Sequence, residues 1–306
     1  MKRIVVGSRG SRLALIQTES VLSKMRERRP DLQFRLTKIT TDGDRAGRSP
    51  SDRLPGVGVF VKELESALLD GRIDMAVHSL KDMPTEIAPG LTLAAVVTRL
   101  DPRDVLVSSK GKLGQLAPGS RIGTGSLRRK AQLLHFRPDL RVEMLRGNVD
   151  TRLRRISLGE LDAVIVAAAA MVRLGCEGSI AEYLPLDLFL PAPGQGTLGI
   201  EVRSDDNELA ELAAMVNDPP TWCGVVAERA FLHALGAGCR APVAALGRVT
   251  GNTIRLEGMV ADAEGHALLQ DSEEGSATDP EQVGIRLAEK LQHMGASQLI
   301  AEARRR

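Results

Sequence analysis

The residues best suited to do chemistry lie in the segment 77–84, VHSLKDMP. His78 and Ser79 end a strand predicted over residues 74–79, and Lys81 and Asp82 follow it. Open α/β sheets bind their ligands beyond the carboxyl ends of strands. A carboxylate beside cations can protonate a leaving amine or accept a proton. The segment therefore predicts an acid–base site at Asp82, although taken alone it could equally form a surface turn.

Positive charge is concentrated in residues 121–155. They hold ten Lys or Arg and three Asp or Glu, a net charge of +7 in a chain whose total is +2. A run of like charges is usually a solvated face. This run, however, contains the same pattern twice: a short strand, small residues, and then the start of a helix.

Each of these two predicted helix starts is flanked by arginines. Arg128 and Arg129 lie in the first turn after Ser126. Asn148 can cap the second helix, and Arg146 and Arg152 flank its start. Unpaired N–H groups at a helix start bind anions. Arginine there opposes the helix dipole, so we expect its role to be bidentate binding of carboxylates or phosphates rather than stability alone.

A third strand-to-helix junction lies near the N-terminus. Residues 7–11, GSRGS, supply Arg9, hydroxyl groups and N–H groups for another anion. Alone this is a weak signal, because Ser11 could simply cap the helix.

The three cysteines are odd in number and widely spaced, which predicts a reducing compartment and argues against a disulfide framework or a zinc site. Cys239 stands in a glycine-rich loop beside Arg240, whose charge favours the nucleophilic thiolate. Cys176 and Cys223 are predicted to be buried, inert thiols. Cys239 is therefore the candidate nucleophile.

Composition limits the possible partners. No apolar run reaches the length of a membrane span and no secretory signal pattern opens the chain, so we expect a cytoplasmic protein without a membrane partner. The five histidines form no HxH or HxxxH pair, so no metal site is predicted. With one Trp, one Tyr and five Phe, the chain lacks the stacking platform of single-strand binders, and we expect no nucleic-acid partner.

Strands alternating with helices predict an α/β fold over the first two thirds of the chain. Linking segments near 98–103 and 190–196 divide this part into two lobes between which the chain crosses twice. We expect lobe 1 to comprise residues 1–98 and 196–216, and lobe 2 to comprise residues 103–190.

The pattern changes after this part. From 218 to 306, a helix over 225–235, a three-stranded antiparallel meander and a final helical pair predict a small α+β domain.

Residues 163–169 are predicted to form a buried strand of parallel type. Residues 42–58, rich in Gly, Pro, Ser and charge, are predicted to form a mobile loop.

Across nearly its whole length the chain resembles the hydroxymethylbilane synthases, also called porphobilinogen deaminases. The order and spacing of six motifs carry the resemblance: GSR at 7–9, HSLKDMP at 78–84, GTGSLRR at 123–129, LRGNVDTRL at 145–153, PAPGQGTLGIE at 191–201 and GAGCRAPV at 236–243. The resemblance implies two lobes like those of periplasmic binding proteins plus a third domain with the cysteine loop.

The resemblance also implies a transferase of tetrapyrrole and heme biosynthesis. Such an enzyme joins four porphobilinogens head to tail with loss of ammonia and releases hydroxymethylbilane. Its cofactor is a dipyrromethane primer, held by a thioether to the residue matching Cys239. Asp82 matches the catalytic aspartate, which would assist departure of ammonia, stabilise the cationic azafulvene and help remove the proton from the attacked carbon.

The remaining site residues are implied in the same way. Porphobilinogen carries an acetate and a propionate, so the growing chain needs guanidinium groups, which the family places at the counterparts of Arg9, Arg128, Arg129, Arg146, Arg152 and Arg173. Positions that contact cofactor or substrate match Ser11, Gln17, Ser79, Lys81, Thr124, Ser126 and Gln195. No metal is implied, and we expect a monomer.

The chain departs from the family pattern at two places. Val57 stands where many members have a lysine, so a basic contact is missing there, for which Arg53 could substitute. Gly125 stands where a serine is common, which removes one hydroxyl. The main alternative is a non-catalytic module whose two lobes bind a small carboxylate; it explains the arginines but gives no role to Asp82 or Cys239.

Overall fold

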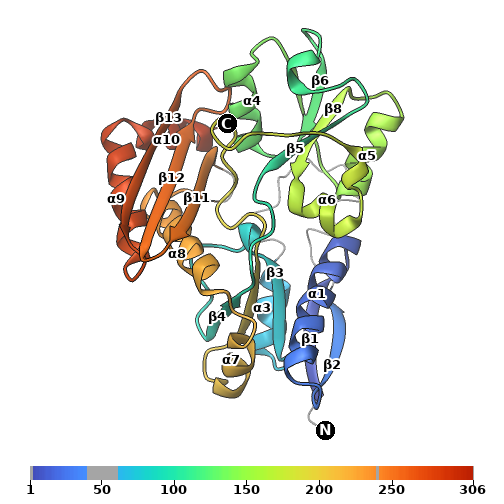
Figure 1. The fold of residues 1–306 in the computed structure, drawn as a ribbon, viewed down its shortest axis with the longest axis vertical. Coiled ribbons are helices and arrows are strands. Elements are labelled where there is room, and N and C mark those ends of the chain that lie inside the picture. The colour runs from blue at the N-terminus through green and yellow to red at the C-terminus, as the bar shows by residue number, and fades with distance from the viewer. Residues whose placement is uncertain (1–2, 40–60, 239–240, 306) are drawn as a thin grey trace. The chain divides into compact units, whose positions relative to one another are not determined.

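The computed structural model describes residues 3–39, 61–238 and 241–305. The chain forms two compact units, and each unit combines two separate stretches of sequence (Figure 1). The first unit comprises Met1–Arg99 and Thr197–Trp222, and the second comprises Leu100–Gly196 and Cys223–Arg306.

The first unit is built on a five-stranded sheet of order β2-β1-β3-β10-β4. Strand β1 is parallel to β2 and β3, whereas β10 is antiparallel to β3 and β4. The strands are β1 Arg3–Arg9, β2 Gln33–Ile39, β3 Met75–Ser79, β4 Leu91–Val96 and β10 Leu198–Arg203.

Helices cover both faces of this sheet. Side chains alternate between the faces of a strand, so Ile4 and Met75 pack with Leu22 of α1 (Arg12–Arg28), together with α7 (Asn207–Ala214). Ala76 on the opposite face packs with Leu64 of α3 (Lys62–Leu69). A short 3-10 helix, η1 (Leu80–Asp82), directly follows β3.

The second unit contains a five-stranded sheet of order β7-β6-β8-β5-β9. Strand β6 is parallel to β7 and β8, and β5 is antiparallel to β8 and β9. The strands are β5 Asp104–Ser108, β6 Arg121–Thr124, β7 Arg141–Met144, β8 Ala163–Ala167 and β9 Ile180–Tyr183.

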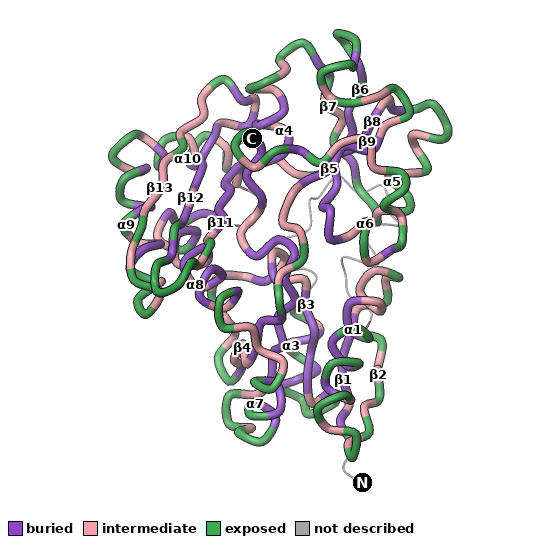
Figure 2. Tube along the Cα trace, viewed as in Figure 1, coloured by how far each residue is buried: buried purple, intermediate pink, exposed green. Residues whose placement is uncertain are grey.

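Helices also flank this second sheet. Leu133 of α4 (Leu127–Phe136) packs on the face that carries Ile165. The opposite face, with Val164, packs against α5 (Val149–Ser157) and α6 (Ala168–Leu174). Strand β8 is buried along its whole length (Figure 2). Two 3-10 helices, η2 (Leu113–Gln115) and η3 (Glu177–Ser179), lie in the connections.

The two sheets have the same strand order. In each, the first three strands along the sheet are parallel, and an antiparallel strand separates them from the last one. That antiparallel strand, β10 or β5, directly follows a linking segment between the units. The chain thus crosses between the units twice. The two sheets, with helices between their strands, confirm the predicted α/β class.

The C-terminal part forms the predicted three-stranded antiparallel sheet, β11-β12-β13. Its elements are α8 Pro219–Ala234, β11 Val243–Thr250, β12 Thr253–Ala261, β13 Leu268–Ser276, α9 Pro280–His293 and α10 Ala296–Arg305. Phe231 of α8 and Leu287 of α9 pack on one face of the sheet with Leu256.

The other face of this small sheet packs on α4. Ala131 contacts Leu246 and Met259 in one apolar cluster, and Lys130 forms an ion pair of 2.7 Å with Glu264. The turn at Gly265 approaches the helix so closely that a Cβ there would lie 2.3 Å from the Ala131 carbonyl oxygen. Glycine is therefore required at this contact.

Several boundaries differ from the predictions. The strand predicted over 163–169 ends at Ala167, because the alanine-rich run that follows forms α6 instead. Strand β8 is parallel to β6 but antiparallel to β5, so the predicted parallel pairing holds for only one of its two neighbours. Helix α8 begins at Pro219 rather than at 225, as proline favours a helix start. Strand β9 and helix α7 were not predicted.

The predicted mobile loop, 42–58, lies outside the described residues. None of the helices in the described ranges is long and apolar enough to span a membrane.

Candidate active site

The first group of candidate residues lies at one edge of the first sheet. Strands β1 and β3 are parallel, so their last residues, Arg9 and Ser79, lie at the same edge. The Ser79 hydroxyl donates to Oε1 of Gln17 over 3.0 Å, which ties α1 to this edge. Ser11 caps α1, since its Oγ accepts from the Ala14 N–H at 3.2 Å.

Lys81 and Asp82 extend this group beyond the end of β3. They lie in η1, where Leu80 and Met83 are each 2% exposed and hold the turn to the core. Lys81 and Asp82, which lie between these two residues in the sequence, are half-buried. Within the described ranges, the Asp82 carboxylate has neither a hydrogen bond nor an ion pair. It is available to a ligand.

A buried hydrogen-bonded pair lies directly behind this edge. Nε2 of His78 is 2.9 Å from Oε2 of Glu201, and both side chains are almost inaccessible. Burial, and then the charge of Glu201, raise the pKa of Glu65 on α3. Sequence reasoning noted His78 but missed Glu201, whose only signal is a carboxylate between the apolar residues Ile200 and Val202.

The second group of candidate residues lies at the corresponding edge of the second sheet. Strand β6 ends at Thr124, whose Oγ1 accepts from the Ser126 N–H at 3.3 Å. Ser126 is the N-cap of α4, and its Oγ accepts from the Arg129 N–H at 3.4 Å. The helix start predicted from the sequence is confirmed.

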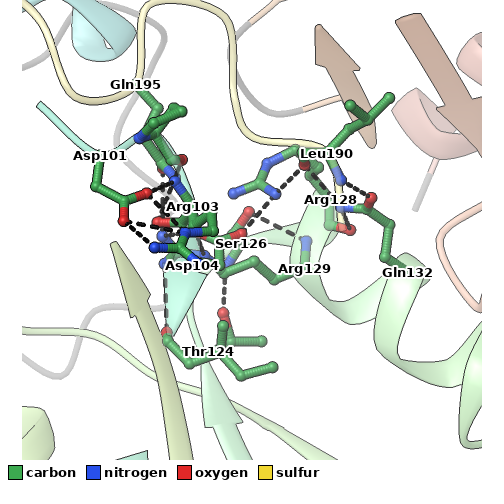
Figure 3. Close-up of polar contacts among 12 residues, drawn as sticks. Asp101, Arg103, Asp104, Thr124, Ser126, Arg128, Arg129, Gln132, Leu190 and Gln195 are labelled. Carbon is green, nitrogen blue, oxygen red and sulfur yellow. Dashed lines mark hydrogen bonds and ion pairs between the residues drawn. The ribbon is translucent and has the colours of Figure 1, made fainter. Parts of the chain in front are cut away.

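Arg128 and Arg129 are buried and share the carboxylate of Asp104 (Figure 3). Arg128 Nη1 lies 2.7 Å from Oδ2, and Arg129 Nη2 lies 2.7 Å from Oδ1. The sequence assigned these arginines to oxyanion binding rather than to stability alone, and the structure adds a buried carboxylate, Asp104, that pairs with both. Asp104 itself was missed by sequence reasoning.

Gln195, in the second linking segment, joins this network. Its Nε2 donates to Asp104 Oδ1 at 2.8 Å and to the carbonyl of Pro102 at 2.7 Å. Both linking segments of the second unit therefore meet at Asp104 (Figure 3).

The second predicted anion junction follows β7. Asn148 caps α5 by accepting from the Thr151 N–H at 2.9 Å, as predicted. Arg146 is exposed, and Arg152 Nε donates to the Gly147 carbonyl over 3.0 Å.

Gly125 packs against this junction. A Cβ at position 125 would lie 2.4 Å from the Leu145 carbonyl oxygen and 3.2 Å from Nη2 of Arg152. The serine that the resemblance implies at this position would not fit here without a backbone shift.

Arg173 lies in the last turn of α6, half-buried. Its Nη2 donates to the carbonyl of Gly196 at 3.0 Å. Burial lowers its pKa to about 10, and no carboxylate in the described part of the chain offsets this cost. A half-buried cation without an anion indicates a place for an anionic ligand.

Cys239 lies outside the described residues, as do Val57 and Arg53. The other two thiols are described. Cys223 is buried, which raises its pKa, and its Sγ lies 3.3 Å from the Ala277 carbonyl oxygen. Cys176 is half-buried. The prediction that Cys223 is buried is confirmed.

These residues fit a group that carries several carboxylates. Arg173 has a buried charge without a counter-ion in the described ranges, and two arginines share one carboxylate at Asp104. In the ranges that the structure describes, no three His, Cys, Asp or Glu side chains gather as metal ligands would.

Fold and site together define a class: α/β proteins with two sheets of the same interrupted strand order and basic side chains near the strand ends. Two family models match the chain. Residues 4–211 match "Porphobilinogen deaminase, dipyromethane cofactor binding domain", and residues 222–293 match "Porphobilinogen deaminase, C-terminal domain". The chain belongs to the porphobilinogen deaminase family.

Curated relatives agree over the full length. The porphobilinogen deaminase of Pelotomaculum thermopropionicum is 47% identical over 306 residues, which cover 99% of this chain and 98% of the relative. That of Geobacter metallireducens is 46% identical over 305 residues, covering 100% and 96%. A solved methionine-binding protein is similar at 14% identity over 70% of this chain and 88% of its own, with a TM-score of 0.44.

Proposed function

We propose that the chain is a transferase of tetrapyrrole and heme biosynthesis. It joins four porphobilinogens head to tail with loss of ammonia and releases hydroxymethylbilane by hydrolysis of the bond to the primer. The match of residues 4–211 to the dipyrromethane cofactor binding domain carries this proposal. The substrate is porphobilinogen. When bound, the dipyrromethane supplies the pyrrole carbon to which the first substrate is added.

Cys239 is the proposed attachment point of the cofactor, through a thioether. Its neighbour Arg240 favours the thiolate that such a bond requires. The other two cysteines support this assignment, since Cys223 is buried with a raised pKa and Cys176 is half-buried.

Asp82 is the proposed catalytic group. In each cycle the C–N bond of the substrate's aminomethyl group breaks, ammonia leaves, and a C–C bond forms to the free pyrrole carbon of the preceding ring. That carbon then loses its proton. A half-buried carboxylate at a strand end can hold the departing ammonium, stabilise the cation that remains and accept the proton.

The remaining residues are proposed to bind and orient carboxylates. Every added ring brings an acetate and a propionate, and guanidinium groups bind carboxylates in a bidentate way. In the first unit these residues are Arg9, Ser11, Gln17, Ser79 and Lys81; in the second they are Thr124, Ser126, Arg128, Arg129, Arg146, Arg152, Arg173 and Gln195.

We also propose that the enzyme works as a monomer in the cytoplasm, without a nucleic-acid or membrane partner. The odd, scattered cysteines support a reducing compartment. Lobe 1 is proposed to comprise residues 1–98 and 196–216, lobe 2 residues 103–190, and the cofactor-carrying domain residues 218–306.

The test compares Asp82→Asn with Asp70→Asn, an exposed carboxylate paired with Arg72 at the surface. Asp82→Asn should keep the fold and the bound primer while turnover of porphobilinogen falls by roughly 100-fold or more. Asp70→Asn should turn over normally. Near-normal turnover in Asp82→Asn would remove the catalytic role, and absence of turnover in the unaltered chain would favour a carboxylate-binding module.

A further inference from the structure

Asp104 occupies a distinctive position in the second unit. It is the first residue of β5, directly after the first linking segment, and its side chain is fully buried. In the sheet it lies opposite Ala167, the last residue of β8. Asp104 therefore stands at the same sheet edge as the start of α4.

The Asp104 carboxylate fixes both arginines at that helix start. Oδ2 accepts from Arg128 Nη1 at 2.7 Å, and Oδ1 accepts from Arg129 Nε at 3.0 Å and from its Nη2 at 2.7 Å. Two guanidinium groups thus share one carboxylate, which leaves one positive charge uncompensated within the group. Buried charge without a counter-ion is costly.

Burial alone would raise the pKa of Asp104, but the charges of Arg128 and Arg129 outweigh it and hold the pKa below its usual value. The carboxylate therefore stays ionised at neutral pH. Oδ1 also accepts from Gln195 Nε2, and Arg128 Nη1 donates to the Leu190 carbonyl at 2.6 Å, so the second linking segment shares the same anchor.

One buried donor of this group has no partner. Nε of Arg128 is inaccessible and makes no hydrogen bond within the described residues. Such an orphaned donor costs free energy, and a polar group kept at this cost is typical of a functional site rather than of a salt bridge selected for stability.

We propose that Asp104 is a positioning residue of the anion site. It holds Arg128 and Arg129 in one orientation and cancels one of their two charges, so that one positive charge remains for a carboxylate of a pyrrole acetate or propionate. This inference rests on the proposed function. The competing view is that Asp104 only stabilises the fold.

Asp162 provides a matched control at the opposite end of the same sheet. It precedes Ala163, the first residue of β8, and its carboxylate accepts from the Arg121 N–H at 2.6 Å and pairs with Lys110 at 2.6 Å. Its side chain is 14% exposed. Asp162→Asn should therefore destabilise the same sheet without touching Arg128 or Arg129.

The experiment uses the full chain purified from cells that cannot make porphobilinogen. Porphobilinogen is added at a series of concentrations, and the gain in intact mass from primer assembly is followed with time. Asp104→Asn should load roughly 10- to 100-fold more slowly than the unaltered chain, because misplaced binding groups cost that much in rate. Asp162→Asn should load at the normal rate.

The melting temperature of each variant is measured alongside. Loading of Asp104→Asn at the normal rate would overturn the inference, as would equal slowing of Asp162→Asn. If Asp104→Asn does not fold, Asp104→Glu decides, since it keeps the charge but displaces the carboxylate: slow loading supports the inference and normal loading overturns it. If the unaltered chain gains no mass, the proposed function fails instead.

Discussion

The guanidinium of Arg173 donates a hydrogen bond to the carbonyl of Gly196 over 3.0 Å, and this carbonyl also accepts from the N–H of Leu100 at 3.2 Å. Arg173 thus contributes a second, dispensable hydrogen bond to Gly196. Arg173 is half-buried, and this burial lowers its pKa to about 10. Its charge therefore destabilises the folded chain.

Arg173→Leu should therefore stabilise the chain while weakening its function. The folded pKa lies below the ordinary value of an arginine, so the folded state disfavours the charge at every pH below about 10. In a Cys239→Ser background, which cannot carry a primer, Arg173→Leu should raise stability by about 1 kcal/mol. Thermal unfolding measures this.

Arg203→Leu is the control for Arg173→Leu. Arg203 is half-buried like Arg173, but its guanidinium pairs with Asp74 at 3.4 Å and with Asp206 at 3.3 Å. Its loss should lower the melting temperature. A lower melting temperature for Arg173→Leu as well would contradict an unpaired, ligand-binding charge.

Gly125→Ser should lower stability by about 1–3 kcal/mol, as overpacking does. The new Cβ would meet the Leu145 carbonyl oxygen at 2.4 Å, so the backbone before Arg146 must shift. Gly178→Ser, whose Cβ would meet nothing within 4 Å, serves as the control. Urea unfolding of both variants measures the difference, and equal stability would show that the junction adapts freely.

Arg146→Leu should slow primer assembly or chain growth by roughly 10-fold, because a charged hydrogen-bond donor for carboxylates is lost. Arg141→Leu is its counterpart at the other end of β7, and both arginines are exposed. Single-turnover kinetics with porphobilinogen should show slowing only for Arg146→Leu. Unchanged elongation there would reduce Arg146 to a solvated surface charge.

Glu65→Gln should stabilise the chain at pH 7, and this gain should disappear as pH falls below the ordinary pKa of a glutamate. Burial and then Glu201 raise the pKa of Glu65, so the folded state holds its proton to higher pH than the unfolded state. Stability is therefore lost as pH rises from the unfolded pKa of a glutamate through the raised folded pKa of Glu65. The substitution by glutamine removes this loss. Melting curves across this range measure the effect.

Asp31→Asn should show the opposite pH dependence to Glu65→Gln. Hydrogen bonding to Arg29 lowers the pKa of Asp31 to about 2, so its contribution is present at neutral pH and is lost in acid. Because the pair is exposed, the effect should be small. The same sign for both variants would contradict the assigned cause.

Local signals explain what the sequence predicted well. Ser126 and Asn148 cap α4 and α5 as expected, because a cap is decided within four residues of chain. Strand alternation with helices and the double crossing also followed from local patterns.

Long-range pairings explain what sequence reasoning missed. Asp104 lies 24 residues from Arg128, and Glu201 lies 123 residues from His78. No spacing rule connects such partners before the sheet brings them together. The sequence therefore predicted the position of Arg128 and Arg129 at the start of α4. It did not predict that both contact the carboxylate of Asp104.

The intact mass of the purified, denatured chain, with peptide mapping around Cys239, tests the central claim most directly. We predict an excess equal to two deaminated porphobilinogen units, located on Cys239 and absent from Cys176 and Cys223. A chain that remains unmodified after incubation with porphobilinogen would contradict the primer, and with it the proposed mechanism.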